Sequence, residues 1–324
     1  MLDGYGRKIG YVRISVTDRC NLRCIYCMPE TAPRTVPEQE LLSFEEIRRL
    51  AEVFGGLGVR RIKITGGEPL VRGNLPELVK MLKAVPGIEQ VTLTTNGVLL
   101  REQLPSLLRA GIDGINLSLD TLHPDIYRTI TGRDVFDRAW DGFLAAREHP
   151  EVPLKINCVP FEVPGQEVWE LAELAREYPV HVRYIEMMPL GLGEKFSAVP
   201  QEAILAELTE RFGRGTPYPG RLGNGPARYY TFPGFCGKIG FISAVSHKFC
   251  SSCNRIRLTA GGFLKTCLQY ETGTDLRALL RSGAGKETIR RAVEEAVRRK
   301  PAEHRFGVPE VEHREQRTMS QIGG

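Results

Sequence analysis

The stretch YVRISVTDRCNLRCIYC, residues 11–27, decides the expected fold because it joins a β-strand to a compact group of cysteines. Its first part alternates apolar and polar side chains, which is the pattern of a strand. The second part holds Cys20, Cys24 and Cys27 in C-x3-C-x2-C spacing, and the next cysteine in the chain is Cys158. A structural zinc site or a fully ligated iron–sulfur cluster normally takes four protein ligands. The loop therefore offers a metal centre one ligand too few.

Three thiolates on one short loop suit a cubane cluster, in which each cysteine binds one iron and the fourth iron stays open. The residues alone leave three alternatives: a zinc site with three thiolates, a redox-active pair with a bystander, and a chance grouping. In a chain whose thiols are reduced, clustered cysteines indicate metal binding or catalysis more than disulfides.

Outward from this strand, the first two thirds of the chain alternate strand-like and helical segments. Strands are expected at 11–17, 60–65, 90–95, 115–120, 154–159 and 181–186. Helices are expected at 43–58, 74–87, 102–111, 135–150 and 165–179. A capping box from Ser43 to Glu46 begins the first helix, and Asn74 is the expected cap of the second. Strands that alternate with helices indicate parallel pairing, so we expect an α/β fold, a partial (β/α)6 barrel of the TIM type.

One face of these strands is polar and partly cationic. The side chains that share this parity, on five successive strands, are Arg13, Lys63, Thr94, Asn116 and Lys155. Strands between helices are covered on both faces, and polar groups on a covered face must line a cavity or bind a ligand. An ordinary barrel instead fills its interior with branched apolar residues. We expect a cationic lumen that holds a ligand; an antiparallel sheet with one solvated face is the alternative.

A glycine-rich turn, TGGEPL at residues 65–70, follows the second strand. Its glycines allow the backbone to approach a ligand closely, and Glu68 adds a carboxylate. Taken alone, the turn is equally typical of a plain connection from strand to helix.

A second cysteine group lies near the C-terminus, where Cys250, Cys253 and Cys267 form C-x2-C-x13-C. This spacing is typical of half a zinc ribbon, for which His247 is a candidate fourth ligand. The arginines at 255 and 257 alternate out from the second cysteine, and they can either clamp phosphates or carboxylates or face solvent.

Composition places the chain among ordinary globular proteins, with 42% hydrophobic and 26% charged residues. Its net charge of +5 is too mild for a nucleic-acid coat. No stretch is long and apolar enough to span a bilayer, and the N-terminus carries no secretion signal. We therefore expect a cytoplasmic protein without nucleic-acid or membrane partners.

Glycine and proline become frequent after about Pro189, so two domains are expected, a barrel at 1–189 and a C-terminal section at 190–324. A helix is expected at 201–213, a strand at 238–246 and helices near 275–299, followed by a flexible tail that ends in two glycines. Of the two remaining cysteines, Cys158 lies on the apolar face of its strand and is expected to be buried, and Cys236 is expected to be structural.

The triad after a first barrel strand, with Tyr26 before its last cysteine, resembles the signature of the radical S-adenosylmethionine (SAM) superfamily. The resemblance implies a [4Fe-4S] cluster on Cys20, Cys24 and Cys27 whose open iron chelates SAM. It further implies that Tyr26, Gly67, Ser118 and Met188 contact SAM. By themselves, Ser118 is only a polar lumen residue and Met188 is typical of packing.

Over nearly the whole chain, the sequence resembles one family of this superfamily, the GTP 3′,8-cyclases. The stretches that carry this resemblance are RISVTDRCNLRCIYCMP, TGGEPLVR, TTNG, NLSLDTL, FCSSCNRIRLT and the terminal IGG. That resemblance implies a second [4Fe-4S] cluster on Cys250, Cys253 and Cys267, whose open iron binds the guanine base. It implies the following GTP contacts: Arg13, Lys63, Thr94, Lys155, Arg255 and Arg257. Lys63 departs from the arginine expected there and lacks the bidentate fork, so its contact is the least secure of these.

The family resemblance also implies the reaction. SAM is cleaved reductively to methionine and a 5′-deoxyadenosyl radical, which removes hydrogen from C3′ of the GTP ribose. The carbon radical attacks C8, and reduction gives 3′,8-cyclo-7,8-dihydroguanosine triphosphate, an intermediate of molybdenum cofactor biosynthesis. We expect Arg13 to assist the final proton or electron step and the terminal Gly323 and Gly324 to reach into the active site.

The implied partners are GTP, a low-potential electron donor such as flavodoxin, and a downstream cyclic pyranopterin monophosphate synthase, with the chain a monomer or homodimer. Two other functions remain open: a peptide-modifying radical SAM enzyme with an auxiliary cluster, and a non-catalytic zinc-binding scaffold. Three cysteines rather than four near the C-terminus favour an open iron and a small substrate.

Overall fold

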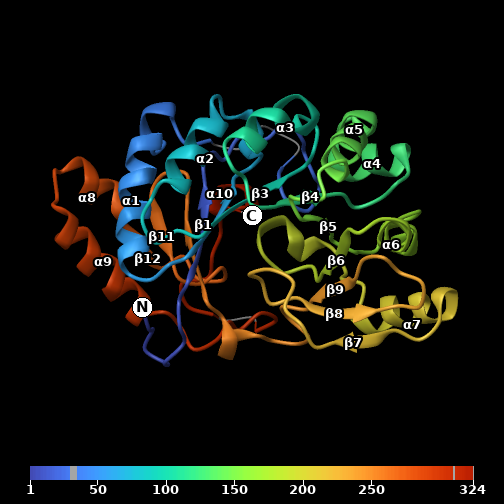
Figure 1. The fold of residues 1–324 in the computed structure, drawn as a ribbon. Helices are drawn as coiled ribbons and strands as arrows, with labels where there is room; N and C mark the ends of the chain where they lie inside the picture. Colours follow the sequence, from blue (N-terminus) through green and yellow to red (C-terminus); the bar gives the residue numbers. More distant parts are fainter. Residues whose placement is uncertain (30–34, 309–310, 324) are drawn as a thin grey trace.

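A computed structural model describes residues 1–29, 35–308 and 311–323, and its strands form one twelve-stranded sheet (Figure 1). The middle of the sheet is parallel and follows chain order: β1 (Tyr11–Ser15), β2 (Arg61–Thr65), β3 (Gln90–Thr95), β4 (Ile115–Ser118), β5 (Leu154–Cys158) and β6 (His181–Ile185). All six predicted strands are confirmed, with ends that differ by a few residues. The fold is the expected partial (β/α) barrel.

The C-terminal section extends this sheet at both ends. On one side β9 (Ile239–Ile242) pairs parallel with β6, and β8 (Arg228–Thr231) and β7 (Thr216–Tyr218) follow antiparallel. On the other side β10 (Arg255–Leu258) pairs parallel with β1, and β11 (Phe263–Lys265) and β12 (Gly273–Asp275) follow antiparallel. One sheet thus crosses the expected domain boundary at residue 189, and that boundary stays a prediction.

Helices cover the outer face of the central strands (Figure 1). The barrel helices are α1 (Phe44–Gly56), α2 (Leu75–Lys83), α3 (Leu100–Arg109), α4 (Pro124–Thr131), α5 (Phe136–Arg147) and α6 (Val168–Glu177). The C-terminal helices are α7 (Gln201–Phe212), α8 (Leu276–Arg281), α9 (Lys286–Arg298) and α10 (Met319–Ile322). No helix in the described ranges is long and apolar enough to cross a membrane.

The helix starts test the capping predictions. Ser43 and Glu46 form the predicted reciprocal capping box at the start of α1. Asn74 occupies the N-cap position of α2 as predicted, but it has a φ of 58° and its side chain makes no capping hydrogen bond. α4 was not predicted, since it is short and holds four β-branched residues with low helix propensity.

The alternation of the strands is confirmed by burial. The apolar parity packs beneath the helices and is fully buried at Val12, Ile14, Ile62, Ile64, Val91 and Leu93. The polar parity therefore points to the inside of the barrel. Because neighbouring parallel strands are in register, Arg13 lies between Arg257 on β10 and Lys63 on β2. One layer of the lumen is thus built from three cations.

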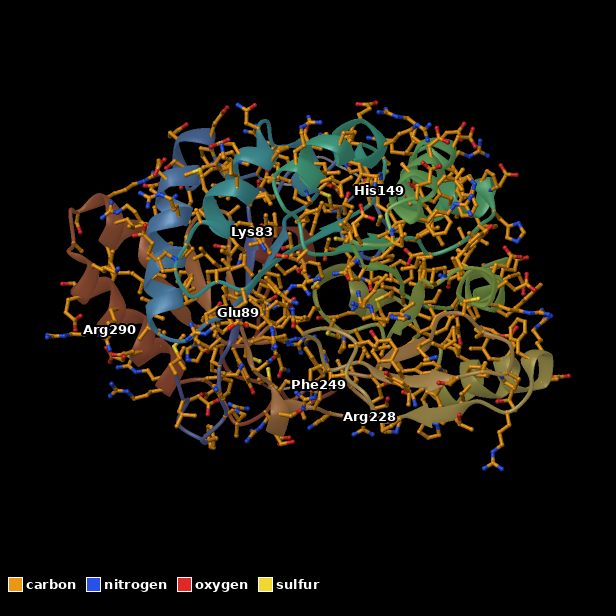
Figure 2. The ribbon with its side chains drawn as sticks, viewed as in Figure 1. Lys83, Glu89, His149, Arg228, Phe249 and Arg290 are labelled. Atoms are coloured by element: carbon orange, nitrogen blue, oxygen red, sulfur yellow. The ribbon has the colours of Figure 1, made fainter. Side chains whose placement is uncertain are left out.

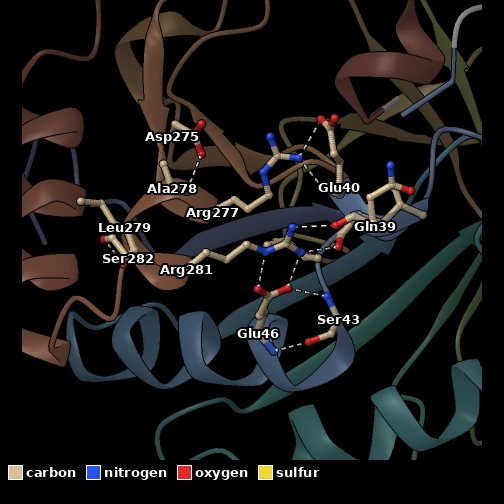
Figure 3. A network of polar contacts seen from close by, with 12 residues as sticks. Gln39, Glu40, Ser43, Glu46, Asp275, Arg277, Ala278, Leu279, Arg281 and Ser282 are labelled. Carbon is tan, nitrogen blue, oxygen red and sulfur yellow. Dashed lines mark hydrogen bonds and ion pairs between the residues drawn. The ribbon is translucent and has the colours of Figure 1, made fainter. Parts of the chain in front are cut away.

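A polar network joins the C-terminal helix α8 to the start of α1 (Figure 3). The Arg281 guanidinium donates to Glu46 Oε1 at 2.8 Å and to the carbonyls of Gln39 and Leu41. Arg277 Nη1 donates to the Glu40 carbonyl at 2.7 Å. These contacts fix α8, and with it the antiparallel strands β11 and β12, against the barrel wall.

The C-terminal tail differs from the flexible end that its composition predicts. α10 begins with a capping box between Thr318 and Gln321, and its Ser320 and Ile322 are buried. Gly323 is described and Gly324 lies outside the described residues. The tail folds because Ile322 supplies an apolar anchor in an otherwise polar segment.

Candidate active site

The first cysteine triad lies on the loop beyond the carboxyl end of β1, where active sites of (β/α) barrels are found. Burial raises the pKa of Cys20 to about 11. Burial and the neighbouring Cys27 hold the pKa of Cys24 well above its usual range, and Asp120 adds to the effect. Burial and Cys20 raise the pKa of Cys27 to about 12, although the backbone N–H of Ser320 donates to its sulfur. The three half-buried thiols therefore share one site, in which Arg23 lowers the pKa of Cys20 but does not outweigh the effect of burial.

The TGGEPL turn packs against this loop. The Gly67 N–H donates to the Thr17 carbonyl at 2.7 Å, and a Cβ added at Gly67 would lie 2.4 Å from the Arg19 oxygen. Only glycine fits such an approach. Glu68 is buried, and it accepts hydrogen bonds from Leu70 N–H, Thr95 Oγ1 and Asn96 N–H. Its carboxylate therefore ties the turn to β3 and has a structural role, although burial raises its pKa to about 7.

The remaining predicted SAM residues lie at the carboxyl ends of their strands. Tyr26 donates a hydrogen bond of 2.7 Å from its hydroxyl to Asp120 Oδ2. Ser118 ends β4, and Met188 follows β6; both are half-buried. Asp120 has no role in the sequence reasoning, although it lies on the polar parity. It also accepts from the Val159 N–H, and burial raises its pKa to about 6.

The second triad lies at the opposite end of the barrel. Cys250 and Cys253 precede the first residue of β10, which runs parallel to β1, and Cys267 follows the antiparallel β11. Burial tends to raise the pKa of Cys253, but Lys300 and Arg255 outweigh it and lower that pKa to about 7. Arg255 also lies over the ring of Phe249, with 4.9 Å to its centroid; Figure 2 labels this phenylalanine. This triad therefore lies among cations.

The donor sets fit polynuclear clusters better than single ions. In the part of the chain that the structure describes, no three cysteine, histidine or acidic side chains converge closely enough to hold one metal ion. Within each triad the thiols nevertheless alter one another's pKa. Each thiolate in a cubane cluster binds a different iron, so a set of three neighbouring thiols supplies the donors for three of its irons. His247, the candidate fourth ligand, points its Nε2 to Glu202 at 3.5 Å.

Between the triads, the lumen carries the predicted cations. Burial lowers the pKa of Lys63 well below its usual value, and Arg183, Arg13 and Lys155 add to the shift. Arg257, half-buried, lies in the same layer as Arg13 and Lys63. These cations lower one another's pKa, so a polyanion bound in the lumen would be favoured by their charge.

Further along the lumen wall, registered strands place Thr94 beside Asn116, Asn116 beside Lys155, and Lys155 beside His181. Burial lowers the pKa of Lys155 to about 8, and Arg183 contributes. Arg183 is a lumen residue that the sequence reasoning missed. It donates to Asn116 Oδ1 at 2.8 Å and to Asn157. The sequence did contain a signal for this residue, because Arg183 alternates with apolar neighbours in the strand segment HVRYIE.

The tail reaches this lumen. The carbonyl of Gly323 accepts hydrogen bonds from Arg257 Nη1 at 2.9 Å and from Thr65 Oγ1 at 3.3 Å. A Cβ at Gly323 would lie 2.9 Å from that of Ser15. Gly323 therefore lies beside the predicted GTP contact Arg257, and its entry into the active site stays a prediction.

The other two cysteines lie outside this site. Cys158 is buried as predicted, and Gln166 Nε2 donates to its sulfur. Cys236 is exposed, and its structural role stays a prediction.

Comparisons with known proteins agree with this arrangement. The model of the radical SAM superfamily matches residues 14–175, and that of the molybdenum cofactor synthesis C domain matches residues 180–306. The chain is 42% identical to a GTP 3′,8-cyclase of Desulforamulus reducens and 45% identical to one of Heliobacterium modesticaldum. Both matches cover all of this chain and all of the relative.

A solved structure shares the fold at lower identity. The crystal structure of Streptococcus suis SuiB bound to precursor peptide SuiA has a TM-score of 0.56 and 17% identity, covering 84% of this chain and 64% of that one. At this identity the likeness concerns the fold alone. The full-length relatives decide the family: the chain belongs to the GTP 3′,8-cyclases of the radical SAM superfamily.

Proposed function

We propose that this chain is a GTP 3′,8-cyclase, which converts GTP to 3′,8-cyclo-7,8-dihydroguanosine 5′-triphosphate in molybdenum cofactor biosynthesis. One observation carries the proposal: two cysteine triads lie at opposite ends of a single lumen whose wall is cationic. A small polyanion bound between them would be held at one end and exposed to chemistry at the other.

The cysteines at 20, 24 and 27 would hold one [4Fe-4S] cluster, and those at 250, 253 and 267 would hold the other. The first cluster, with SAM, supplies a strongly hydrogen-abstracting radical, and the second supplies an open iron to the guanine base. Tyr26, Gly67, Ser118 and Met188 would contact SAM, since they lie at the end of the barrel that carries the first triad.

The lumen residues would bind and orient GTP. Arg13, Lys63 and Arg257 form one cationic layer, and Lys155 and Thr94 belong to the next. Arginine forks and lysine amines at this depth would neutralise the triphosphate, and Arg255 would contact the nucleotide beside the second triad. Fixing both ends of the substrate would hold the ribose in one orientation, which is a major source of rate enhancement.

Arg13 is also proposed to assist the last proton or electron step. It lies centrally, between Arg257 and Lys63. The Arg13→Ala variant should then change the partition between cyclised product and abortive products. Weaker GTP binding with an unchanged partition would limit Arg13 to binding.

The decisive experiment is anaerobic incubation of the reconstituted protein with SAM, a strong low-potential reductant and GTP. Formation of 5′-deoxyadenosine with loss of GTP is expected, as is a content of about eight irons per chain. If 5′-deoxyadenosine forms while GTP is untouched, the substrate is a different molecule, such as a peptide. If the protein binds zinc without a visible chromophore, it is a scaffold. Flavodoxin and the downstream synthase belong to the same proposal, as electron donor and as consumer of the product.

A further inference from the structure

The segment between β7 and β8 crosses the amino-terminal end of the barrel. In Figure 1 this golden segment extends from the edge strands toward the centre of the view. Asn224 Nδ2 donates to Oε1 of Gln90, the first residue of β3, at 3.0 Å. The segment is therefore fastened to a strand far from it in sequence.

A second contact joins the segment to the lumen wall. Tyr229 Oη donates to the Leu222 carbonyl at 3.2 Å. The same hydroxyl is in hydrogen-bond contact with Arg183, inside the lumen. The backbone of residues 222–224 is thus held from both sides, by the tyrosine and by the Asn224–Gln90 contact.

Gly223, in the middle of this segment, covers Lys155. Its φ is +100°, and a Cβ added to it would lie 3.0 Å from Lys155 Nζ. Any larger residue would therefore occupy the space in front of the ammonium group. In the described part of the chain, no ion pair is formed by Lys155, and no backbone N–H of residues 222–225 donates a hydrogen bond to another protein group.

We propose that residues 222–225 and Lys155 together form the subsite for the terminal phosphate of the nucleotide. Consecutive glycine-rich amides beside an unneutralised ammonium group are the chemistry that binds a phosphate dianion. Gly223 is then a specificity-determining position, because the closed end of the lumen measures the length of the polyphosphate chain. The inference rests on the proposed function and adds to it the number of phosphates that the site recognises.

The test is calorimetric titration of the anaerobically reconstituted full-length protein with GTP, GDP and GMP, without SAM or reductant. The unaltered protein should bind GTP more tightly than GDP and GDP more tightly than GMP. Gly223→Ala should weaken GTP binding about tenfold or more, the worth of one charge-assisted contact, and leave GMP binding unchanged. An equal loss for GTP and GMP, or no loss for either, would overturn the proposal.

Two glycines of the chain provide matched controls. Gly56, the exposed last residue of α1 and outside the proposed subsite, has open space where its Cβ would stand. Gly234 has a φ of +73° and also has no neighbour there, so Gly234→Ala carries the backbone strain without the contact. Both alanine variants should bind GTP as the unaltered protein does; a loss in the Gly234 variant equal to that of Gly223→Ala would assign the effect to strain and overturn the proposal.

A second route avoids the strained position. Asn224→Ala and Gln90→Ala each break the same exposed hydrogen bond, so each should weaken GTP binding several-fold, and the double variant should be no weaker than either single one. Additive losses would contradict the role of this contact. If the unaltered protein binds GTP but these variants are normal, the subsite is wrong and the cyclase proposal stands. If the unaltered protein binds no guanine nucleotide, both proposals fall.

Discussion

The two cysteine triads contain the same donors, and they differ in the charges around one thiol. Cys20, Cys24 and Cys27 are half-buried beside one another and near Asp120, and the pKa of each thiol is raised. At the other end of the barrel, burial and the neighbouring cysteines raise the pKa of Cys250, whereas Lys300 and Arg255 lower that of Cys253 to about 7. Identical ligands are thus tuned by the elements that pack around them, which suits the first site to a strong reductant and the second to an anionic substrate.

The largest effect should separate the triads by function. Cys24→Ser should abolish both 5′-deoxyadenosine formation and GTP consumption. Each rate should fall by more than the roughly 100-fold that is typical when a residue behind a metal ligand is replaced. Cys253→Ser should abolish GTP conversion and leave reductive SAM cleavage measurable, because the SAM site lies at the other end of the lumen. Iron content should fall to about half in each variant. Equal loss of SAM cleavage in both variants would contradict this division.

The next prediction asks whether the triads are structurally independent. Lys265 and Glu315 form a fully buried ion pair, with Lys265 two residues before Cys267 and Glu315 at the base of the tail that contacts Cys27. Glu315→Gln leaves the Lys265 ammonium group buried without its partner, at a cost of about 3–5 kcal/mol. Hydrogen exchange of α10 should accelerate accordingly, and iron should be lost from both sites.

A control for this change exists on the surface. Lys248 and Glu303 form an exposed pair at 3.2 Å, and pairs of this kind contribute about 0–1 kcal/mol. Glu303→Gln should therefore leave the exchange of α10 unchanged. Should Glu315→Gln behave like this control, the buried pair would not connect the two sites.

The sequence predicts those features of the two triads that depend on residues close together in the chain, and it does not predict those that depend on distant residues. Strand alternation, parity and the spacing of each triad are local patterns, and they predicted the central strands, the lumen cations and both cysteine groups. The charges around the triads come from afar: Asp120 ends the fourth strand unit and Lys300 follows α9. No local sequence pattern indicates that Asp120 or Lys300 lies beside a cysteine, because only the order of strands in the sheet brings these residues together.

The same reasoning explains the smaller misses. The additions of β9 and β10 to the barrel are pairings between distant segments, which periodicity cannot detect. Gly- and Pro-rich composition predicted a loop around residue 223, yet nothing in it indicated Lys155 as the neighbour. The tail was expected to be flexible because the single buried Ile322 is a weak local signal.

A third prediction concerns the direction in which the midpoint potential of each cluster changes when a nearby charge is removed. Reduction adds an electron to a cluster, so a nearby carboxylate lowers its midpoint potential and a nearby ammonium group raises it. Asp120→Asn should raise the potential of the first cluster, and Lys300→Gln should lower that of the second, each by about 50–100 mV. Redox titration followed by electron paramagnetic resonance, without SAM, reads both. Lys286→Gln, at the exposed start of the same helix, should change neither; shifts of the same sign in the first two variants would contradict the comparison.

The smallest effect is expected in the iron-free protein, as a difference in thiol reactivity. A pKa of about 7 makes Cys253 mostly thiolate at pH 8, whereas a pKa of about 11 leaves Cys20 about 0.1% ionised. The Cys20 thiolate, which has the higher pKa, is intrinsically the stronger nucleophile, and this offsets part of the difference in thiolate fraction. Cys253 should therefore be alkylated on the order of tenfold faster than Cys20 at pH 8.

The pH dependence of the two alkylation rates should differ as well. As pH falls from 8 to 6, the Cys253 rate should decline through a midpoint near 7, since protonation removes the nucleophile. The Cys20 rate should instead rise about tenfold for each pH unit up to 10, because its midpoint lies above that range. Mass spectrometry of the two peptides measures both profiles, and superimposable profiles would mean that the two triads share one electrostatic environment.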